Sequence, residues 1–152
     1  MRQNGFPSLG RSAENGFTLV ELMTVVAILG VLTSIVVLAI PDPRGALADE
    51  AEKLAARTSA VRDLAIMEAR DTRLVVSPMG YSFERHQRGT WAALAEKPFR
   101  AETFSDGTSA APVVVMFDTA GMADETQSIT LARDGVRSSV LVDAGGRVRV
   151  GG

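Results

Sequence analysis

The one long apolar run of this chain opens with the stretch Gly16-Phe17-Thr18-Leu19-Val20-Glu21-Leu22-Met23 and extends to Ile40. Its non-apolar residues are Thr18, Glu21, Thr24, Gly30, Thr33 and Ser34. An α-helix rises about 1.5 Å per residue, so the run would reach roughly 36 Å, against about 30 Å for the hydrocarbon core of a bilayer. The sequence therefore predicts a transmembrane helix over residues 17–40.

Residues 1–16 precede this run and form a polar leader that contains Arg2 and Arg11. An ordinary secretory signal carries its apolar segment ahead of the cleavage site and loses it on cleavage. Here the apolar segment follows the leader, so a cut between Gly16 and Phe17 would keep it on the mature chain. Positive residues on the leader side favour a cytoplasmic N-terminus. Residues 41–152 would then face the periplasm of a bacterial cell.

Glu21 is the one carboxylate inside the apolar run. A charged residue at mid-depth in a bilayer costs roughly 2.5–3.5 kcal/mol, and such residues usually have a function. Glu21 lies one helical turn from Phe17, so the amine created by the cut would lie near the same depth. Removing one partner of such a buried charge pair costs several kcal/mol. The alternative is an interfacial Glu21 whose carboxylate reaches the lipid headgroups.

The short motif at residues 16–23 resembles the type III prepilin signal of type IV pilins and type II secretion pseudopilins. This resemblance implies cleavage after Gly16 by a prepilin peptidase and N-methylation of Phe17, the new first residue. It also implies that Glu21 is the assembly glutamate, whose amine partner in a filament could come from a neighbouring subunit.

Composition limits the remaining possibilities. The chain has 152 residues, of which 46% are hydrophobic and 22% are charged, so it has room for one small domain beside the apolar run. A formal net charge of −2 disfavours a protein that coats nucleic acid. The absence of cysteine excludes disulfides, thiolate metal sites and a cysteine nucleophile.

Residues 41–70 carry a second helical pattern. Pro41-Asp42-Pro43 interrupts the first helix, because proline removes a backbone donor and crowds the preceding turn. Apolar or small residues then recur at spacings of three and four, and these are Leu47, Ala51, Leu54, Thr58, Val61 and Ala65. We expect an amphipathic helix over roughly 45–70 that packs on a sheet; a bundle or coiled-coil partner is the alternative.

Residues 71–152 change to a period of two and predict a β domain. Pro78-Met79-Gly80 and Asp134-Gly135 have the composition of hairpin turns. Residues 95–112 are expected to form a long irregular connection, and Trp91, Phe99 and Phe104 are expected to fill the core. The strands are expected near residues 73–77, 81–84, 112–117, 128–132, 136–142 and 147–150, and residues 89–91 are expected to start another strand or a covering loop.

This order of elements resembles the minor pseudopilin H (GspH-like) and FimT-like branch of the pilin family. The stretches that carry the resemblance beyond the signal are Tyr81-Ser82-Phe83, Trp91, Val115 to Gly121, and Gly146 to Val150. The resemblance implies an α+β fold, in which a long N-terminal helix, broken near Pro41–Gly45, packs on an antiparallel β-sandwich.

Catalytic and metal-binding chemistry has little support in the sequence. His86 is the only histidine and stands between Arg85 and Arg88, so a Ser-His-Asp triad or a histidine-rich metal site is not expected. Asp118, Asp124 and Glu125 lack the spacing of a calcium loop and are interpreted as a solvated acidic loop. We expect no enzyme activity, no metal and no cofactor.

Arg147 and Arg149 are candidates for contact with DNA or with a partner protein. Period-two spacing puts both on one face of a strand, with Arg133 and Arg137 nearby. The stretch resembles the Gly-Arg-x-Arg tail through which FimT-like minor pilins are thought to bind DNA. The competing interpretation, which we favour, is an edge strand protected by charge or used for partner contact.

The sequence hypothesis is a minor pseudopilin of the type II secretion system in the bacterial inner membrane, with one transmembrane helix. Its expected partners are other minor and major pseudopilins, the prepilin peptidase, the inner-membrane platform, and a secretin or exoprotein. Nucleic acid is not an expected partner. A FimT-like minor pilin that binds DNA for uptake is the first alternative. An unprocessed single-pass anchor that carries a binding domain is the second.

Overall fold

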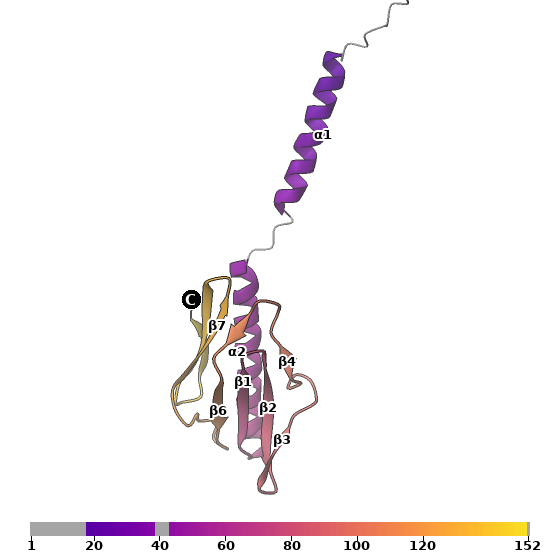
Figure 1. The fold of residues 1–152 in the computed structure, drawn as a ribbon. Helices are drawn as coiled ribbons and strands as arrows, with labels where there is room; N and C mark the ends of the chain where they lie inside the picture. Colours follow the sequence, from indigo (N-terminus) through magenta and orange to yellow (C-terminus); the bar gives the residue numbers. More distant parts are fainter. Residues whose placement is uncertain (1–17, 39–42, 152) are drawn as a thin grey trace, which may run out of the picture. The chain divides into compact units, whose positions relative to one another are not determined.

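The computed structural model describes residues 18–38 and 43–151. The chain divides into two units, residues 1–40 and 41–152. The described elements are labelled in Figure 1, and they are α1 Leu19–Leu38, α2 Pro43–Glu68, β1 Thr72–Ser77, β2 Gly80–Gln87, β3 Thr90–Ala93, β4 Glu102–Thr103, β5 Ser109–Ala110, β6 Val113–Phe117, β7 Gln127–Arg133, β8 Val136–Val142 and β9 Val148–Gly151.

The first unit contains α1. Two hydroxyls inside this apolar helix donate to carbonyls one turn earlier: Thr24 Oγ1 to Val20 O at 2.8 Å, and Thr33 Oγ1 to Leu29 O at 2.7 Å. These polar groups therefore need no solvent. In the part of the chain that the structure describes, no helix has both the length and the apolar character needed to cross a membrane. Residues 17, 39 and 40 of the expected span lie outside the described residues, as does the leader.

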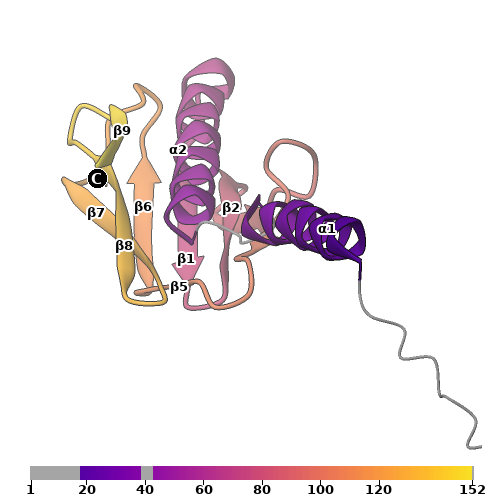
Figure 2. The same ribbon diagram turned by 90° about the horizontal axis from the view of Figure 1, so that it is seen from above.

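The second unit is organised around α2. Pro43 stands at its first position, where the missing N–H costs no helical hydrogen bond. The predicted apolar stripe is confirmed, because each of its residues is at most 1% exposed, namely Leu47, Ala51, Leu54, Thr58, Val61 and Ala65. The helix packs on β1 of one sheet and on β7, β8 and β9 of another (Figure 2). The helix therefore covers antiparallel sheets, as expected for the α+β class.

Both sheets are antiparallel. The first has the order β3-β2-β1-β6, with β4 paired to one end of β2, and the second has the order β5-β7-β8-β9. The two predicted hairpin turns are confirmed: Ser77 pairs with Gly80 across Pro78-Met79, and Arg133 pairs with Val136 across Asp134-Gly135. Both residues of the second turn have positive φ, 50° and 78°, which is the geometry of a type I′ turn.

The core lies between α2 and the inner faces of the two sheets. Phe83 and Phe117 are fully buried, and Phe99 and Phe104 are 8% and 6% exposed. The prediction that Trp91 fills this core is wrong. Trp91 pairs with His86 across the β2–β3 hairpin and lies with it on the outer face, because Phe83 faces inward and alternation turns His86 outward.

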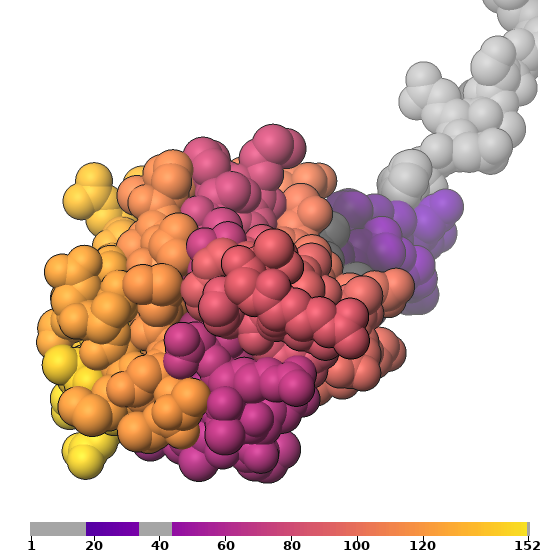
Figure 3. Space-filling model, turned by 90° about the horizontal axis from the view of Figure 1, so that it is seen from below, coloured from indigo at the N-terminus to yellow at the C-terminus, as the bar shows by residue number. Residues whose placement is uncertain are grey.

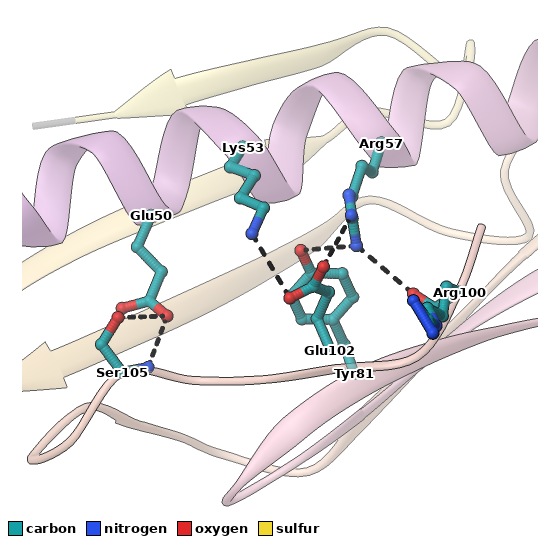
Figure 4. A network of polar contacts seen from close by, with 7 residues as sticks. All are labelled: Glu50, Lys53, Arg57, Tyr81, Arg100, Glu102 and Ser105. Carbon is teal, nitrogen blue, oxygen red and sulfur yellow. Dashed lines mark hydrogen bonds and ion pairs between the residues drawn. The ribbon is translucent and has the colours of Figure 1, made fainter. Parts of the chain in front are cut away.

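The connection between β3 and β6 contains the two-residue strands β4 and β5 and is held on α2 by charged groups (Figure 4). Glu102 accepts hydrogen bonds from Arg57 at 2.8 Å and from Lys53 at 3.3 Å. Arg57 also donates to the carbonyl oxygen of Arg100 at 3.3 Å. About two turns before Arg57 on α2, Glu50 accepts the N–H of Ser105 at 2.8 Å. We call Lys53, Arg57 and Glu102 the polar clasp.

Two pKa values are shifted at the clasp and beside it. Burial opposes ionisation of Glu102, but the hydrogen bonds and charges of Lys53 and Arg57 outweigh it and hold the Glu102 pKa below its ordinary value. Burial raises the pKa of Tyr81, and the nearby guanidinium of Arg57 offsets part of that rise. The carboxylate is therefore stabilised as an anion, and the phenol as a neutral group.

Two turns meet at the end of the domain where α2 finishes, which is the end viewed in Figure 3. The N–H of Ala123 donates to the carbonyl oxygen of Ala144 at 3.1 Å. Arg62 on α2 donates from Nε to the carbonyl oxygen of Gly121 at 3.2 Å. The turns at residues 118–124 and 143–147 are thus fixed to each other and to the helix.

Candidate assembly and contact sites

The N-terminal site begins with a helix cap. The hydroxyl oxygen of Thr18 accepts the N–H of Glu21 at 3.2 Å, and the carbonyl oxygen of Thr18 accepts the N–H of Leu22 at 3.1 Å. Thr18 is therefore the N-cap of α1, and it satisfies a donor that the helix itself cannot pair. Glu21 follows in the first turn, where the positive end of the helix dipole favours a carboxylate. Gly16 and Phe17 lie outside the described residues.

Apart from Glu21, Thr24 and Thr33, the described side chains on the surface of α1 are apolar or small. Every residue from 18 to 33 is exposed within the chain. Its large apolar side chains are Leu19, Val20, Leu22, Met23, Val25, Val26, Ile28, Leu29, Val31 and Leu32. A helix that is apolar all round is stable only when lipid or protein surrounds it. This surface is therefore the strongest indication in the chain of an external apolar environment.

The C-terminal arginines are arranged around Asp143. The backbone N–H of Arg147 donates to Asp143 Oδ1 at 2.9 Å, and the guanidinium of Arg149 lies 3.6 Å from Asp143 Oδ2. Both arginine side chains are exposed. Arg149 belongs to β9, whereas Arg147 precedes the strand. A carboxylate therefore offsets part of the positive charge at the place where a phosphate would have to bind.

The other two arginines of the expected basic stripe lie on different faces. Arg149 pairs with Leu141 on β8, and alternation along β8 puts Arg137 on the same outer face. Arg133 alternates with buried Ile129 and Leu131 on β7, which turns it toward the inner face. The exposed stripe consequently has three members, Arg137, Arg147 and Arg149.

The remaining candidate residues have structural roles. His86 is partly exposed, and its ring centroid lies 5.2 Å from that of Trp91. Asp118 Oδ1 accepts the N–H groups of Ala120 and Met122, both at 2.9 Å, which shapes the acidic loop. Within residues 18–38 and 43–151, no group of three His, Cys, Asp or Glu residues could hold a metal ion. The absence of enzyme activity stays a prediction.

Sequence reasoning missed the polar clasp and the outward position of Trp91. A signal for Trp91 existed, because Arg88 and Gly89 form the two-residue turn of the β2–β3 hairpin, with φ of 53° and 82°. That turn fixes the register and pairs Trp91 with His86. No comparable local signal predicts the clasp, since Arg57 and Glu102 are 45 residues apart.

Comparison with protein families finds one match, which covers the N-terminal region. The prokaryotic N-terminal methylation motif matches residues 11–40. This range includes Gly16, Phe17 and Glu21. Among curated proteins, none matches the chain by sequence.

Comparison with solved structures finds a similar fold in minor pilins and minor pseudopilins. The type IV minor pilin FimU of Pseudomonas aeruginosa superposes with a TM-score of 0.58 and 18% sequence identity, covering 72% of this chain and 90% of FimU. The minor pseudopilin EpsH from the type 2 secretion system of Vibrio cholerae superposes with a TM-score of 0.59 and 14% identity, covering 68% of this chain and 94% of EpsH. At these identities the likeness establishes a shared α+β fold.

Proposed function

We propose that this chain, which joins a prokaryotic N-terminal methylation motif to the fold of minor pilins and minor pseudopilins, is a minor pseudopilin of a type II secretion system. It would enter the periplasmic pseudopilus, the filament that drives export of folded proteins across the outer membrane. Its partners would be other minor and major pseudopilins, the prepilin peptidase and the inner-membrane platform, with a secretin or exoprotein as a further contact. Its role is assembly and recognition, without a catalytic step.

The apolar surface of α1, which lies within the matched methylation motif, is the observation that carries this proposal. Every described large apolar side chain of the helix is exposed within the chain. Removing such a surface from water stabilises a helix by about 25 cal/mol per Å². The apolar surface of α1 would be removed from water by lipid while the chain is anchored in the inner membrane. It would be removed from water by neighbouring helices once the chain is in the centre of a filament.

The cap at Thr18 supports a pairing role for Glu21. Because Thr18 Oγ1 already accepts the Glu21 N–H, the carboxylate is not needed to cap its own helix. After cleavage at Gly16, the methylated amine of Phe17 would supply a positive charge of the kind that a carboxylate in apolar surroundings requires. When the amine belongs to the adjacent subunit, the pair would set the stagger between subunits.

The test is a deletion of the gene in its own host, followed by complementation. We expect the deletion strain to retain secreted proteins in the periplasm and to keep surface pili and DNA uptake. The wild-type chain should restore secretion, and Glu21→Ala should not. Glu52→Ala, which changes an exposed glutamate on α2, is the matched control and should restore secretion fully. Normal secretion combined with lost DNA uptake would reject the secretion role.

The alternative is a FimT-like minor pilin that binds DNA. The exposed Arg137, Arg147 and Arg149 on one face of the second sheet favour it, because cations along a strand can contact successive phosphates. The contacts of Asp143 with the backbone of Arg147 and the side chain of Arg149 oppose it. We therefore rank this function second.

DNA-shift assays on the detergent-solubilised chain separate the two functions. The DNA-binding alternative predicts binding that weakens with salt and is lost in the Arg147→Ala, Arg149→Ala double variant. Arg70→Ala with Arg88→Ala removes two exposed arginines elsewhere in the domain and serves as the control. Equal shifts for both double variants would indicate nonspecific attraction and remove the alternative.

A further inference from the structure

A pocket of about 190 Å³ opens on the outer face of the first sheet. Its walls come from segments that are distant in the sequence, namely the residue before β1, strand β3, strand β6 and the turn after β6. The lining residues are Asp71, Trp91, Met116, Phe117, Asp118, Met122, Ala123 and Asp124. The pocket is outside the N-terminal and C-terminal sites described above. We call it the methionine pocket.

The apolar part of this pocket is open to solvent. Met116 is 39% exposed and Met122 is 52% exposed, and Trp91 is partly exposed beside them. Methionine adapts its shape to varied partners and is frequent at binding surfaces. Val114, 40% exposed, continues the apolar surface along β6 beyond the pocket. The volume suits one long side chain, and the extended apolar surface suits the residues that flank it.

The walls are held in place before any partner binds. Asp124 Oδ1 accepts the N–H of Met116 at 3.4 Å, and the Asp124 N–H donates to the Met116 carbonyl oxygen at 3.2 Å. The N–H of Met122 donates to Asp118 Oδ1 at 2.9 Å. The N–H of His86 donates to the carbonyl oxygen of Asp71 at 2.8 Å, which ties the wall before β1 to β2. A preorganised pocket loses little entropy on binding.

The charge of the pocket is negative. Asp71, Asp118 and Asp124 stand around it, and none of them forms an ion pair with a residue in the described part of the chain. Arg73 lies over the Trp91 ring, 4.3 Å from its centroid, but it is already paired with Glu84. Three carboxylates around an apolar floor therefore select a ligand that has an aliphatic stem and a cationic end.

We propose that the methionine pocket binds an arginine side chain that a partner protein presents between apolar residues. The aliphatic stem would lie against Met116 and Met122, and the guanidinium would reach the carboxylates of Asp71 and Asp124. Arginine fits better than lysine, because its planar fork can pair with two carboxylate oxygens and tolerates partial burial. The flanking apolar residues would cover Val114. This inference is independent of which filament or machine the chain serves.

Trp91 provides the readout, because it is the only tryptophan in the chain. The full chain in detergent micelles is titrated with the peptide acetyl-Ala-Leu-Arg-Leu-Ala-amide while Trp91 fluorescence is recorded. The same peptide with citrulline in place of arginine keeps the shape and removes the charge. We expect a saturable change with a dissociation constant of roughly 1 mM for such a short ligand. The citrulline peptide should bind roughly fivefold more weakly, and about 0.5 M salt should remove that difference.

Substitutions of the pocket aspartates test whether the peptide binds in the methionine pocket. Asp71→Asn and Asp124→Asn should each weaken the arginine peptide roughly threefold and leave the citrulline peptide unchanged. Asp49→Asn, on the exposed side of α2, is the matched control and should bind as the wild type does. Unchanged thermal midpoints show that each variant is folded.

Three results would overturn the proposal. The first is no saturable signal, and the second is equal affinity for the two peptides. The third is a change in Trp91 fluorescence with protein concentration alone, which would assign the pocket to a second copy of this chain.

Discussion

Gly146 lies against Gly121 so closely that a Cβ added to Gly146 would stand 1.9 Å from the Gly121 carbonyl oxygen. Both glycines have φ of 75°, a conformation that other residues rarely adopt. The same carbonyl oxygen accepts a hydrogen bond from Arg62 on α2. This contact joins the turn that lines the methionine pocket to the turn at residues 143–147, which ends at Arg147.

Gly146→Ala should therefore destabilise the domain by about 2–4 kcal/mol, because it adds a backbone clash to the strain of a positive φ. Gly89→Ala is the matched control, since Gly89 also has positive φ, 82°, but has nothing within 4 Å of the added Cβ. The free energy of unfolding of the control variant should fall by only about 1 kcal/mol. Chemical denaturation measures the free energy of unfolding of both variants. An equal loss in Gly146→Ala and Gly89→Ala would contradict the close contact of Gly146 with Gly121.

The variant Glu102→Gln tests the polar clasp, because the contribution of Glu102 to the stability of the domain depends on pH. The pKa of Glu102 is held below the ordinary value of 4.5, so the stabilisation is fully present above pH 4.5 and is lost as the pH falls through the folded-state pKa. At pH 7 the variant should be less stable by about 1 kcal/mol. Denaturation from pH 7 to pH 3 should show the difference shrinking toward acid, and a difference that is constant with pH would argue against the clasp.

Tyr81→Phe tests the other shifted group at alkaline pH. Burial raises the Tyr81 pKa above 10.0, so the neutral phenol contributes stability below pH 10.0 that is lost as the pH rises through the folded-state pKa. The variant should match the wild type near pH 7 and lose less stability above pH 10. Because Tyr81 is the only tyrosine, its ultraviolet absorbance gives the pKa directly. A midpoint below 10.0 would contradict the burial effect.

The parts of the fold that the sequence predicted are those with a local cause. Burial of one face of α2 requires apolar residues at spacings of three and four, and Leu47 to Ala65 supply them. A type I′ turn requires two residues that tolerate positive φ, and Asp134-Gly135 meets that requirement. Each feature follows from a short window of residues, so each could be predicted without tertiary information.

The features that escaped prediction depend on contacts between distant residues. Trp91 was assigned to the core because large aromatic residues usually provide its bulk, yet the hairpin register turned it outward to line the methionine pocket. The contact of Gly121 with Gly146 joins two turns, and nothing near either glycine indicates the other. The N-terminal candidates were recognised from their motif alone, and the pairing of Glu21 stays a prediction.

Mass spectrometry of the mature N-terminus tests the central claim most directly. The full chain is produced in its own host, extracted from membranes and analysed intact and after digestion. We expect a mature chain that begins at N-methylated Phe17 and lacks residues 1–16. A variant with Gly16→Leu should keep its leader, which shows that the cut depends on the motif. A wild-type chain that retains Met1 to Gly16, with an unmodified Phe17, would show that the chain is not processed as a pilin-like subunit.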